Sequence, residues 1–434
     1  MKIDHVTFKK FFLYLSFFYY LGFLNFITGM FGGGGDDVFA TSAAGSIANQ
    51  IVGTLLLLMS LLLLLKVKIV QISLFIKHFW LWGLLIFWFV LSTYWSYAPP
   101  VTFRRVIAFT TLVLTAYCLV QIFTPKSLLI ALVVTVTLAA TIGLIEAIIS
   151  PQNAFISVGH RAGAFTGMYF DKNAGARLYA NIILIIFGLE LYKKRWGIIA
   201  LSILTLCLLM SRSATSLVIV VTGCSLIFLF KYMQSRNTQQ NLVRLITIAI
   251  LLSIAAYVIL ALYEFILGLL GRDPDLTDRT IIWELMQRYI EAEFFKGYGF
   301  GAFWASDAVS EFINRWGFIG NAHSGYYEAL LHGGIIALVL VISILIHSMW
   351  VFTKNYVNGD SPSITPVLVA IIIIQAIVNY IGFIIINHNA DDMFLFLIAY
   401  FINLSIYSGL NSKKYDSFKA YSENRKNRGI SHVT

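Results

Sequence analysis

The sequence predicts an all-α polytopic integral membrane protein with about twelve transmembrane helices and a helical lobe outside the bilayer. Of its 434 residues, 59% are hydrophobic and only 12% are charged, whereas roughly 25% of the residues of soluble globular proteins are charged. The apolar residues form runs close to twenty residues long, the length at which a helix crosses a hydrocarbon core of about 30 Å. This composition excludes a soluble globular enzyme and a disordered chain.

The hydrophobic runs locate the membrane helices. The expected spans are residues 11–30, 46–65, 79–96, 103–123, 127–149, 173–192, 197–211, 213–231, 245–270, 324–349, 364–386 and 393–410. The first run is too long for the apolar core of a cleavable signal peptide, so we expect it to remain as a helix. The three cysteines lie inside apolar runs, and we expect neither disulfides nor a cysteine metal site.

These spans divide the chain into four parts. The parts are residues 1–270 with nine helices and an outer loop at 150–172, residues 271–323 as an extramembrane lobe, residues 324–410 with three helices, and residues 411–434 as a basic cytoplasmic tail.

The distribution of basic residues predicts the orientation. With the N-terminus in the cytoplasm, 20 of the 31 lysines and arginines lie on the cytoplasmic side, as the positive-inside rule requires, and both termini lie there. The other 11 comprise nine arginines and two lysines. Phosphate and carboxylate recognition favours arginine, because its guanidinium is a rigid two-pronged donor. The outer side is therefore predicted to bind an anion, with pairing to loop acids or lipid headgroups as the alternative. In a membrane chain the net charge of +10 does not indicate a nucleic-acid partner.

The outer lobe is predicted to begin with a helix and to continue in a tight turn. Helical spacing of apolar residues extends from Thr277 to about Phe295. The stretch KGYGFGAFW follows, and its three alternate glycines favour a tight, exposed turn. The lobe also carries eleven aromatic residues. Interfacial anchoring and sugar stacking are both open uses for them.

Arg212, Arg279 and His323 share one kind of position, at or near the predicted start of a helix. Such ends present free backbone N–H groups and a partial positive charge, which favour phosphate. Arg104 and Arg105 repeat the arrangement after a proline pair. Together these residues predict a pyrophosphate-binding site, whereas any one of them alone could be an interfacial cation. The further residues expected to bind substrate are Arg161, Arg177, Lys172, Asn173 and Glu328.

His323 is the candidate general base. A neighbouring positive charge lowers a histidine pKa and keeps the imidazole neutral, which suits proton removal from an alcohol. Glu328, about one turn into the next span, could orient the imidazole or contact another helix.

Acidic residues offer a metal-dependent alternative. Asp36 and Asp37 lie in the first outer loop, and Asp273 and Asp275 form a DxD pattern, the kind of pattern that can hold a divalent ion beside a sugar phosphate. The proline between the latter two indicates a turn, and no histidine has a partner at metal-ligand spacing. We expect no metal and no cofactor.

Several motifs resemble those of the O-antigen ligase and polymerase superfamily, with ExoQ-like and Wzy-type polysaccharide polymerases as the most similar members. They are LTDRTIIWELMQRYIEAEFFKGYGFGAFW, NAHSGYYEALLHGG, SRSAT at 211–215, WSYAPPVTFRR at 95–105 and GAFTGMYFDKNAGA at 163–176. Asp278 stands where the family pattern has glycine, and Ser324 where it has asparagine.

The resemblance implies a metal-independent glycosyltransferase of the bacterial inner membrane with its active site facing the periplasm. Its donor would be an undecaprenyl-pyrophosphate-linked glycan. Arginines would hold the pyrophosphate and a histidine would lie at the reaction centre, roles that carry over to Arg212, Arg279 and His323. Membrane lipids and a chain-length regulator would be its other partners.

Three functions compete at this stage. The leading one is a polymerase that joins lipid-linked repeat units, and the second is a ligase that transfers the finished glycan to a lipid A core or another acceptor. The third is a flippase or transporter of a lipid-linked glycan. A flippase needs charges along a path through the membrane, whereas here the cations gather on the outer side and the spans are nearly free of charge.

Overall fold

The computed structural model describes residues 5–31, 46–65, 69–157, 162–169, 171–235, 237–261, 279–316, 320–361, 363–388 and 391–409. Within these ranges the chain is helical, with one isolated antiparallel bridge between Phe155 and Phe165 and no strand. The predicted all-α class is therefore confirmed.

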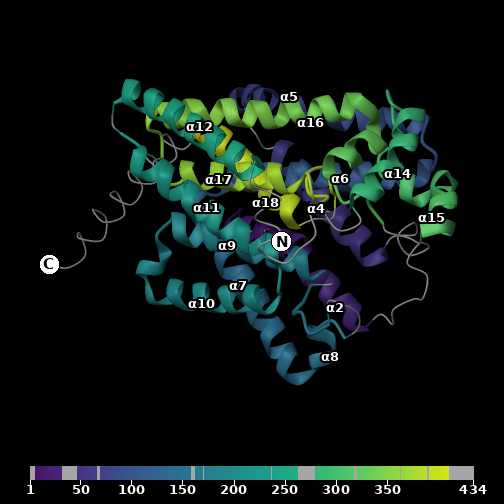
Figure 1. The fold of residues 1–434 in the computed structure, drawn as a ribbon, viewed down its shortest axis with the longest axis horizontal. Coiled ribbons are helices and arrows are strands. Elements are labelled where there is room, and N and C mark those ends of the chain that lie inside the picture. The colour runs from purple at the N-terminus through teal and green to yellow at the C-terminus, as the bar shows by residue number, and fades with distance from the viewer. Residues whose placement is uncertain are drawn as a thin grey trace.

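The helices follow one another closely along the chain (Figure 1). They are α1 (His5–Tyr20), α2 (Phe23–Phe31), α4 (Ile47–Leu65), α5 (Ile69–Leu91), α6 (Pro99–Ile122), α7 (Pro125–Ile149), α8 (Pro151–Ala154), α9 (Lys172–Gly188), α10 (Arg195–Met210), α11 (Ala214–Met233), α12 (Thr238–Ala261), α14 (Arg279–Ala292), α15 (Ser310–Trp316), α16 (Gly325–Asn358), α17 (Thr365–Val378) and α18 (Asp391–Tyr407). Short 3₁₀ turns lie at Ser92–Tyr94, Leu191–Lys193, Phe303–Ala305 and Asp307–Val309.

The chain is a multi-pass membrane protein. Among the described residues, six helices are long and apolar enough to cross a bilayer, and α1 and α2, bent by 56°, could form a seventh, broken span. Each of the twelve expected spans overlaps a helix, but α9, α10, α17 and α18 are only 14 to 17 residues long. The number of spans stays a prediction.

One expected span ends early. The apolar run from 364 was expected to continue as a helix to 386, but α17 ends at Val378. Asn379 turns the chain, because its side-chain carbonyl accepts hydrogen bonds from the N–H groups of Ile384 (3.2 Å) and Ile385 (2.8 Å). Apolar composition conceals this turn, since Ile384 and Ile385 are themselves buried.

Helices α9, α17 and α18 form the centre of the bundle, and most of their residues are buried. Helix α4 has only three buried residues, Leu56, Met59 and Ser60. Several of its other leucines are exposed, as lipid-facing residues are: Leu55, Leu58, Leu61, Leu62 and Leu65. In Figure 1, α16 runs beside α5, and α14 and α15 lie near one end of it.

A break in α16 receives the glycine-rich turn of the lobe. Gly333 (φ −150°, ψ 21°) and Gly334 (φ 64°, ψ −162°) interrupt the helical backbone. The N–H of Tyr298 donates to the carbonyl of Leu331 (2.8 Å), and the Trp88 indole donates to the carbonyl of Gly333 (2.8 Å). A Cβ on Gly297 would lie 2.7 Å from the backbone nitrogens of both glycines, so this approach requires glycine there.

The lobe has its own core. Helix α14 begins at Arg279 and ends at Ala292, three residues before the expected end. Positive φ angles at the three alternate glycines (64°, 100° and 69°) confirm the tight turn. The turn was expected to be exposed but is buried, because it packs into the break in α16. Trp283, Tyr298 and Trp304 are buried, and so these three aromatics serve packing in place of sugar stacking.

Candidate functional site

The segment that carries His323 is fixed on both sides. Before it, Ala322 donates its N–H to Glu328 Oε1 (2.5 Å) and accepts a hydrogen bond from the Trp283 indole (3.0 Å). After it, the N–H of Gly325 donates to the carbonyls of Asn379 (2.8 Å) and Gly382 (2.9 Å). His323 itself has a left-handed backbone with φ of 51°. Non-glycine residues rarely adopt this conformation, and it persists only where the surroundings hold it in place.

Glu328 organises this segment from inside the protein. Its side chain is fully buried. In addition to the hydrogen bond from the N–H of Ala322, it accepts one from the Trp304 indole (2.9 Å). His332 Nε2 lies 3.0 Å from its other oxygen. A carboxyl group with these partners supports the His323 segment, and so we assign Glu328 a positioning role in place of the direct substrate contact expected from the sequence.

The segment before α6 pairs with the glycine-rich turn. The N–H of Tyr97 donates to the carbonyl of Tyr298 (3.0 Å), and the N–H of Phe300 donates to Ser92 Oγ (3.1 Å). The Arg105 guanidinium donates to the carbonyl of Gly301. Two motifs that are far apart in the sequence are therefore in direct contact.

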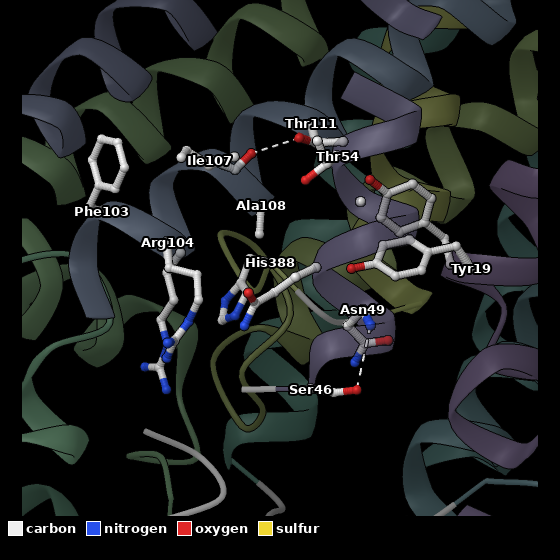
Figure 2. A pocket seen from close by; sticks show the side chains of 14 residues that line it. Tyr19, Ser46, Asn49, Thr54, Phe103, Arg104, Ile107, Ala108, Thr111 and His388 are labelled. Atoms are coloured by element: carbon white, nitrogen blue, oxygen red, sulfur yellow. Dashed lines mark hydrogen bonds between the residues drawn. The ribbon is translucent and has the colours of Figure 1, made fainter. Parts of the chain in front are cut away.

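Arg104 and Arg105 line a cavity of about 480 Å³ together with His388 (Figure 2). No aspartate or glutamate is among the described residues that line it. Burial, with the charges of Arg105, His332 and Arg104, holds the pKa of His388 well below its usual 6.5. The cavity therefore offers two guanidinium groups and a neutral imidazole, a combination that suits an anion.

His388 was not among the site residues predicted from the sequence. It follows a run that was expected to be helical, and no local motif marks it. The ring centroid of Phe300, in the glycine-rich turn, lies 5.1 Å from that of His332 and 6.2 Å from that of His388. Arg105 also interacts electrostatically with Glu328. The cavity therefore lies next to Glu328 and His332, the residues that support the His323 segment.

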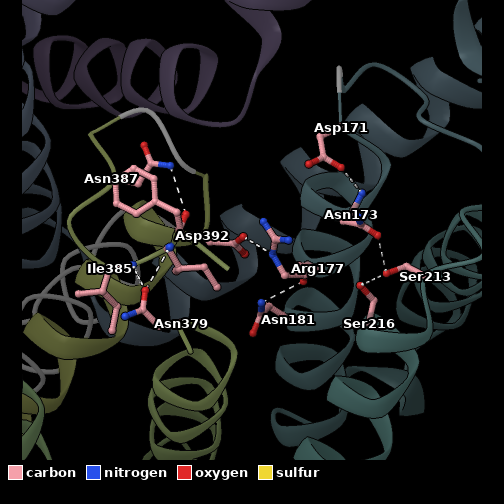
Figure 3. A network of polar contacts seen from close by, with 12 residues as sticks. Asp171, Asn173, Arg177, Asn181, Ser213, Ser216, Asn379, Ile385, Asn387 and Asp392 are labelled. Atoms are coloured by element: carbon pink, nitrogen blue, oxygen red, sulfur yellow. Dashed lines mark hydrogen bonds and ion pairs between the residues drawn. The ribbon is translucent and has the colours of Figure 1, made fainter. Parts of the chain in front are cut away.

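A second group of predicted residues surrounds the turn between α10 and α11. Lys172 Nζ lies 3.4 Å from the carbonyls of Ser211 and Arg212, and Ser213 Oγ donates to Asn173 Oδ1 (3.2 Å; Figure 3). Arg212 is exposed, with φ of 51°, and its Nη1 lies 3.4 Å from the carbonyl of Ala162. The structure therefore brings Lys172, Asn173 and Arg212 together, with the first two holding the turn that presents the third.

Arg177 has a structural partner. Its Nε lies 2.7 Å from Asp392 Oδ2, in a largely buried ion pair that joins α9 to α18 (Figure 3). Because this carboxylate balances the guanidinium, Arg177 is better explained by packing between helices than by substrate binding.

The remaining predicted residues are only partly described. Arg279 is the first described residue of α14, and the predicted helix start at Thr277 and Asp278 lies outside the described residues. Arg161 and the acidic pairs at 36–37 and 273–275 lie outside the described residues. Among the described ones, no three histidine, cysteine or acidic side chains form a group that could hold a metal ion.

Comparison with known proteins supports the superfamily resemblance. Residues 197–342 match the family model described as O-antigen ligase. Over these residues the chain is similar to the O-antigen ligase and polymerase superfamily. The chain is also 25% identical over 163 residues to the exopolysaccharide production protein ExoQ of Rhizobium meliloti (strain 1021). That alignment covers 36% of this chain and 37% of ExoQ.

The superfamily resemblance predicted from the sequence is thus confirmed, and it supports a membrane enzyme of the ligase or polymerase type. The matched region contains Arg212, Arg279 and His323. Arg104, Arg105 and His388 lie outside it, and so their inclusion in the site depends on the cavity that they share.

Proposed function

We propose that the protein joins lipid-linked oligosaccharide units into a longer glycan, using an undecaprenyl-pyrophosphate-linked glycan as the donor. The observation that carries the proposal is the cavity lined by Arg104, Arg105 and His388, with no carboxylate among its described lining residues. Such a site suits a pyrophosphate, because each guanidinium group can donate two parallel hydrogen bonds to phosphate oxygens.

The proposed reaction exchanges one bond for another. A hydroxyl oxygen of the acceptor sugar attacks the anomeric carbon of the donor sugar, and the bond from that carbon to the pyrophosphate oxygen breaks. The lipid pyrophosphate leaves with the bonding electrons, and fixed guanidinium groups stabilise its negative charge. The hydroxyl proton passes to His323 as the general base. We assign Arg212 and Arg279 to the pyrophosphate, and the arginines replace the positive charge of a metal ion.

The proposed setting is the bacterial inner membrane, with both termini in the cytoplasm and the 271–323 lobe in the periplasm. A lipid-linked donor stays in the membrane while its sugars extend from the periplasmic face. Under this orientation the starts of α4, α6 and α16 lie at the same face as the lobe. A chain-length regulator would act on the growing polymer there.

A ligase is the second candidate, and the family model's own description favours it. The two reactions differ in the acceptor. Purified protein incubated with lipid-linked oligosaccharide alone should give a ladder of longer products if it polymerises. Product that forms only when a separate acceptor lipid is added, as a single shift, would assign the ligase reaction.

A further inference from the structure

The cavity beside α6 has two chemically different walls. One wall is cationic and carries Arg104, Arg105 and His388. The other is built by the end of α1 and the first turns of α4, and it carries Tyr19, Ser46, Asn49, Gln50 and Thr54. In Figure 2, His388 lies between Arg104 on one side and Asn49 on the other.

The second wall is neutral and rich in hydrogen-bonding groups. Carboxamides both donate and accept, hydroxyl groups do the same, and none of these groups carries a charge at neutral pH. A phosphate gains little from such a wall, whereas sugar hydroxyl groups need partners of this kind. Asn49 Nδ2 lies 3.3 Å from Asn25 Oδ1 and its N–H lies 3.5 Å from Ser46 Oγ, and these contacts orient this wall.

A third surface of the cavity is apolar. Phe103 and Ile107 on α6 line it and are 61% and 38% exposed. Both belong to a helix that is long and apolar enough to cross a bilayer. Apolar, cationic and neutral polar surfaces thus meet in one cavity. They match, in this order, the lipid chain, the phosphate and the first sugar of a lipid-linked glycan.

We propose that the α1 and α4 wall recognises the sugar attached to the phosphate of the lipid-linked substrate, and that Asn49, Gln50 and Thr54 determine its specificity. The inference rests on the proposed function, because it takes the cationic wall as the phosphate site. It also places sugar selection outside residues 197–342, the region that matches the family model.

The first test fills the cavity without removing a polar group. Gly53 lies on α4 in the cavity wall, and a Cβ there meets only Tyr19, at 3.5 Å from its hydroxyl oxygen, so a larger side chain extends into open space. Gly53→Phe should reduce polymer synthesis at least tenfold at matched membrane levels. Gly83→Phe is the control, because Gly83 lies on α5 and its Cβ would meet only Phe79 at 3.8 Å. Equal activity of the two variants would overturn the proposal.

The second test separates sugar recognition from phosphate recognition. Purified protein in nanodiscs is titrated with undecaprenyl pyrophosphate and with the same lipid carrying one sugar. Asn49→Leu and Gln50→Leu should weaken binding of the sugar-bearing lipid by roughly fivefold to tenfold each, the loss of one hydrogen bond, and leave the sugar-free lipid unchanged. Arg105→Ala should weaken both lipids.

Other outcomes distinguish failure of the sugar assignment from failure of the polymerase proposal. If Asn49→Leu weakens both lipids equally, or neither, the sugar assignment fails while the polymerase proposal stands. If phosphatidylglycerol displaces the sugar-bearing lipid as well as the sugar-free lipid does, the cavity is a general anionic-lipid site and the assignment fails. If the wild-type protein binds the sugar-bearing lipid with the expected pattern but forms no ladder, the polymerase proposal fails and the recognition site remains.

Discussion

Glu328 should control catalysis through the position of His323. Replacing it with alanine removes the acceptor of two buried donors, the N–H of Ala322 and the indole N–H of Trp304. Each donor left unsatisfied costs roughly 1–3 kcal/mol, so the free energy of unfolding should fall by about 2–6 kcal/mol. Glu328→Gln keeps an oxygen in the same place, and its cost should stay below about 2 kcal/mol.

The effect on rate should be separable from the effect on stability. A displacement of about 1 Å of a catalytic group can cost roughly 100-fold in rate, and the Glu328 side chain holds the residue directly before His323. Glu328→Gln replaces the oxygen that lies 3.0 Å from His332 Nε2 with an amide nitrogen, so the side chain should be held less firmly in place. Single-turnover glycan transfer should therefore slow under conditions in which the variant is fully folded. Thermal unfolding in detergent and quenched-flow product analysis measure the two effects.

A double-mutant cycle provides the decisive comparison. If Glu328 acts only through His323, Glu328→Gln should have no further effect on the rate in a His323→Ala background. Asp392→Asn is the matched control, because it weakens a different buried pair, with Arg177, and its effect should multiply with that of His323→Ala. Equal rate losses from Glu328→Gln in both backgrounds would refute the positioning role.

The other predictions concern charge, metal, topology and strain. Arg212→Lys and Arg279→Lys should impair polymer synthesis nearly as much as alanine, by roughly 30- to 150-fold, because lysine lacks the two-pronged donor; full complementation by the lysine variants would remove both from the pyrophosphate site. Activity should persist in excess EDTA, and loss that magnesium or manganese reverses would bring the acidic pairs outside the described residues into the mechanism. In a chain without native cysteines, an impermeant thiol reagent should label Ser310→Cys and not Lys194→Cys in intact cells, both positions being exposed; the opposite pattern would invert the topology. His323→Asn should unfold at about the wild-type temperature, because asparagine tolerates the left-handed backbone, and should lose roughly 10²–10⁴-fold in rate; near wild-type turnover would exclude the general base.

The features predicted correctly from the sequence are those that depend on residues close together in the chain. Apolar runs located every membrane helix that the structure describes, and alternate glycines predicted the positive φ angles of the lobe turn. The end of α17 was missed because one amide, that of Asn379, turns a run that is otherwise apolar.

Contacts between segments that are far apart in the chain could not be predicted from local sequence patterns. Glu328 was named as a candidate, but its partners Ala322 and Trp304 are brought to it by the fold of the lobe against α16. His388 enters the cavity of Arg104 and Arg105 only because the loop before α18 approaches α6. Arg177 resembled a substrate-binding cation in the sequence, since nothing near it in the chain indicates its ion pair with Asp392.

Polymerisation of lipid-linked oligosaccharide by this protein can be measured with purified protein in nanodiscs and one defined lipid-linked repeat unit. Products are separated by chain length over time, beside an Arg105→Ala sample at the same protein concentration. We expect a ladder that lengthens with time in the wild-type sample and is lost in the variant. No elongated product from the wild-type protein, or a single shift that requires an added acceptor lipid, would contradict the polymerase proposal.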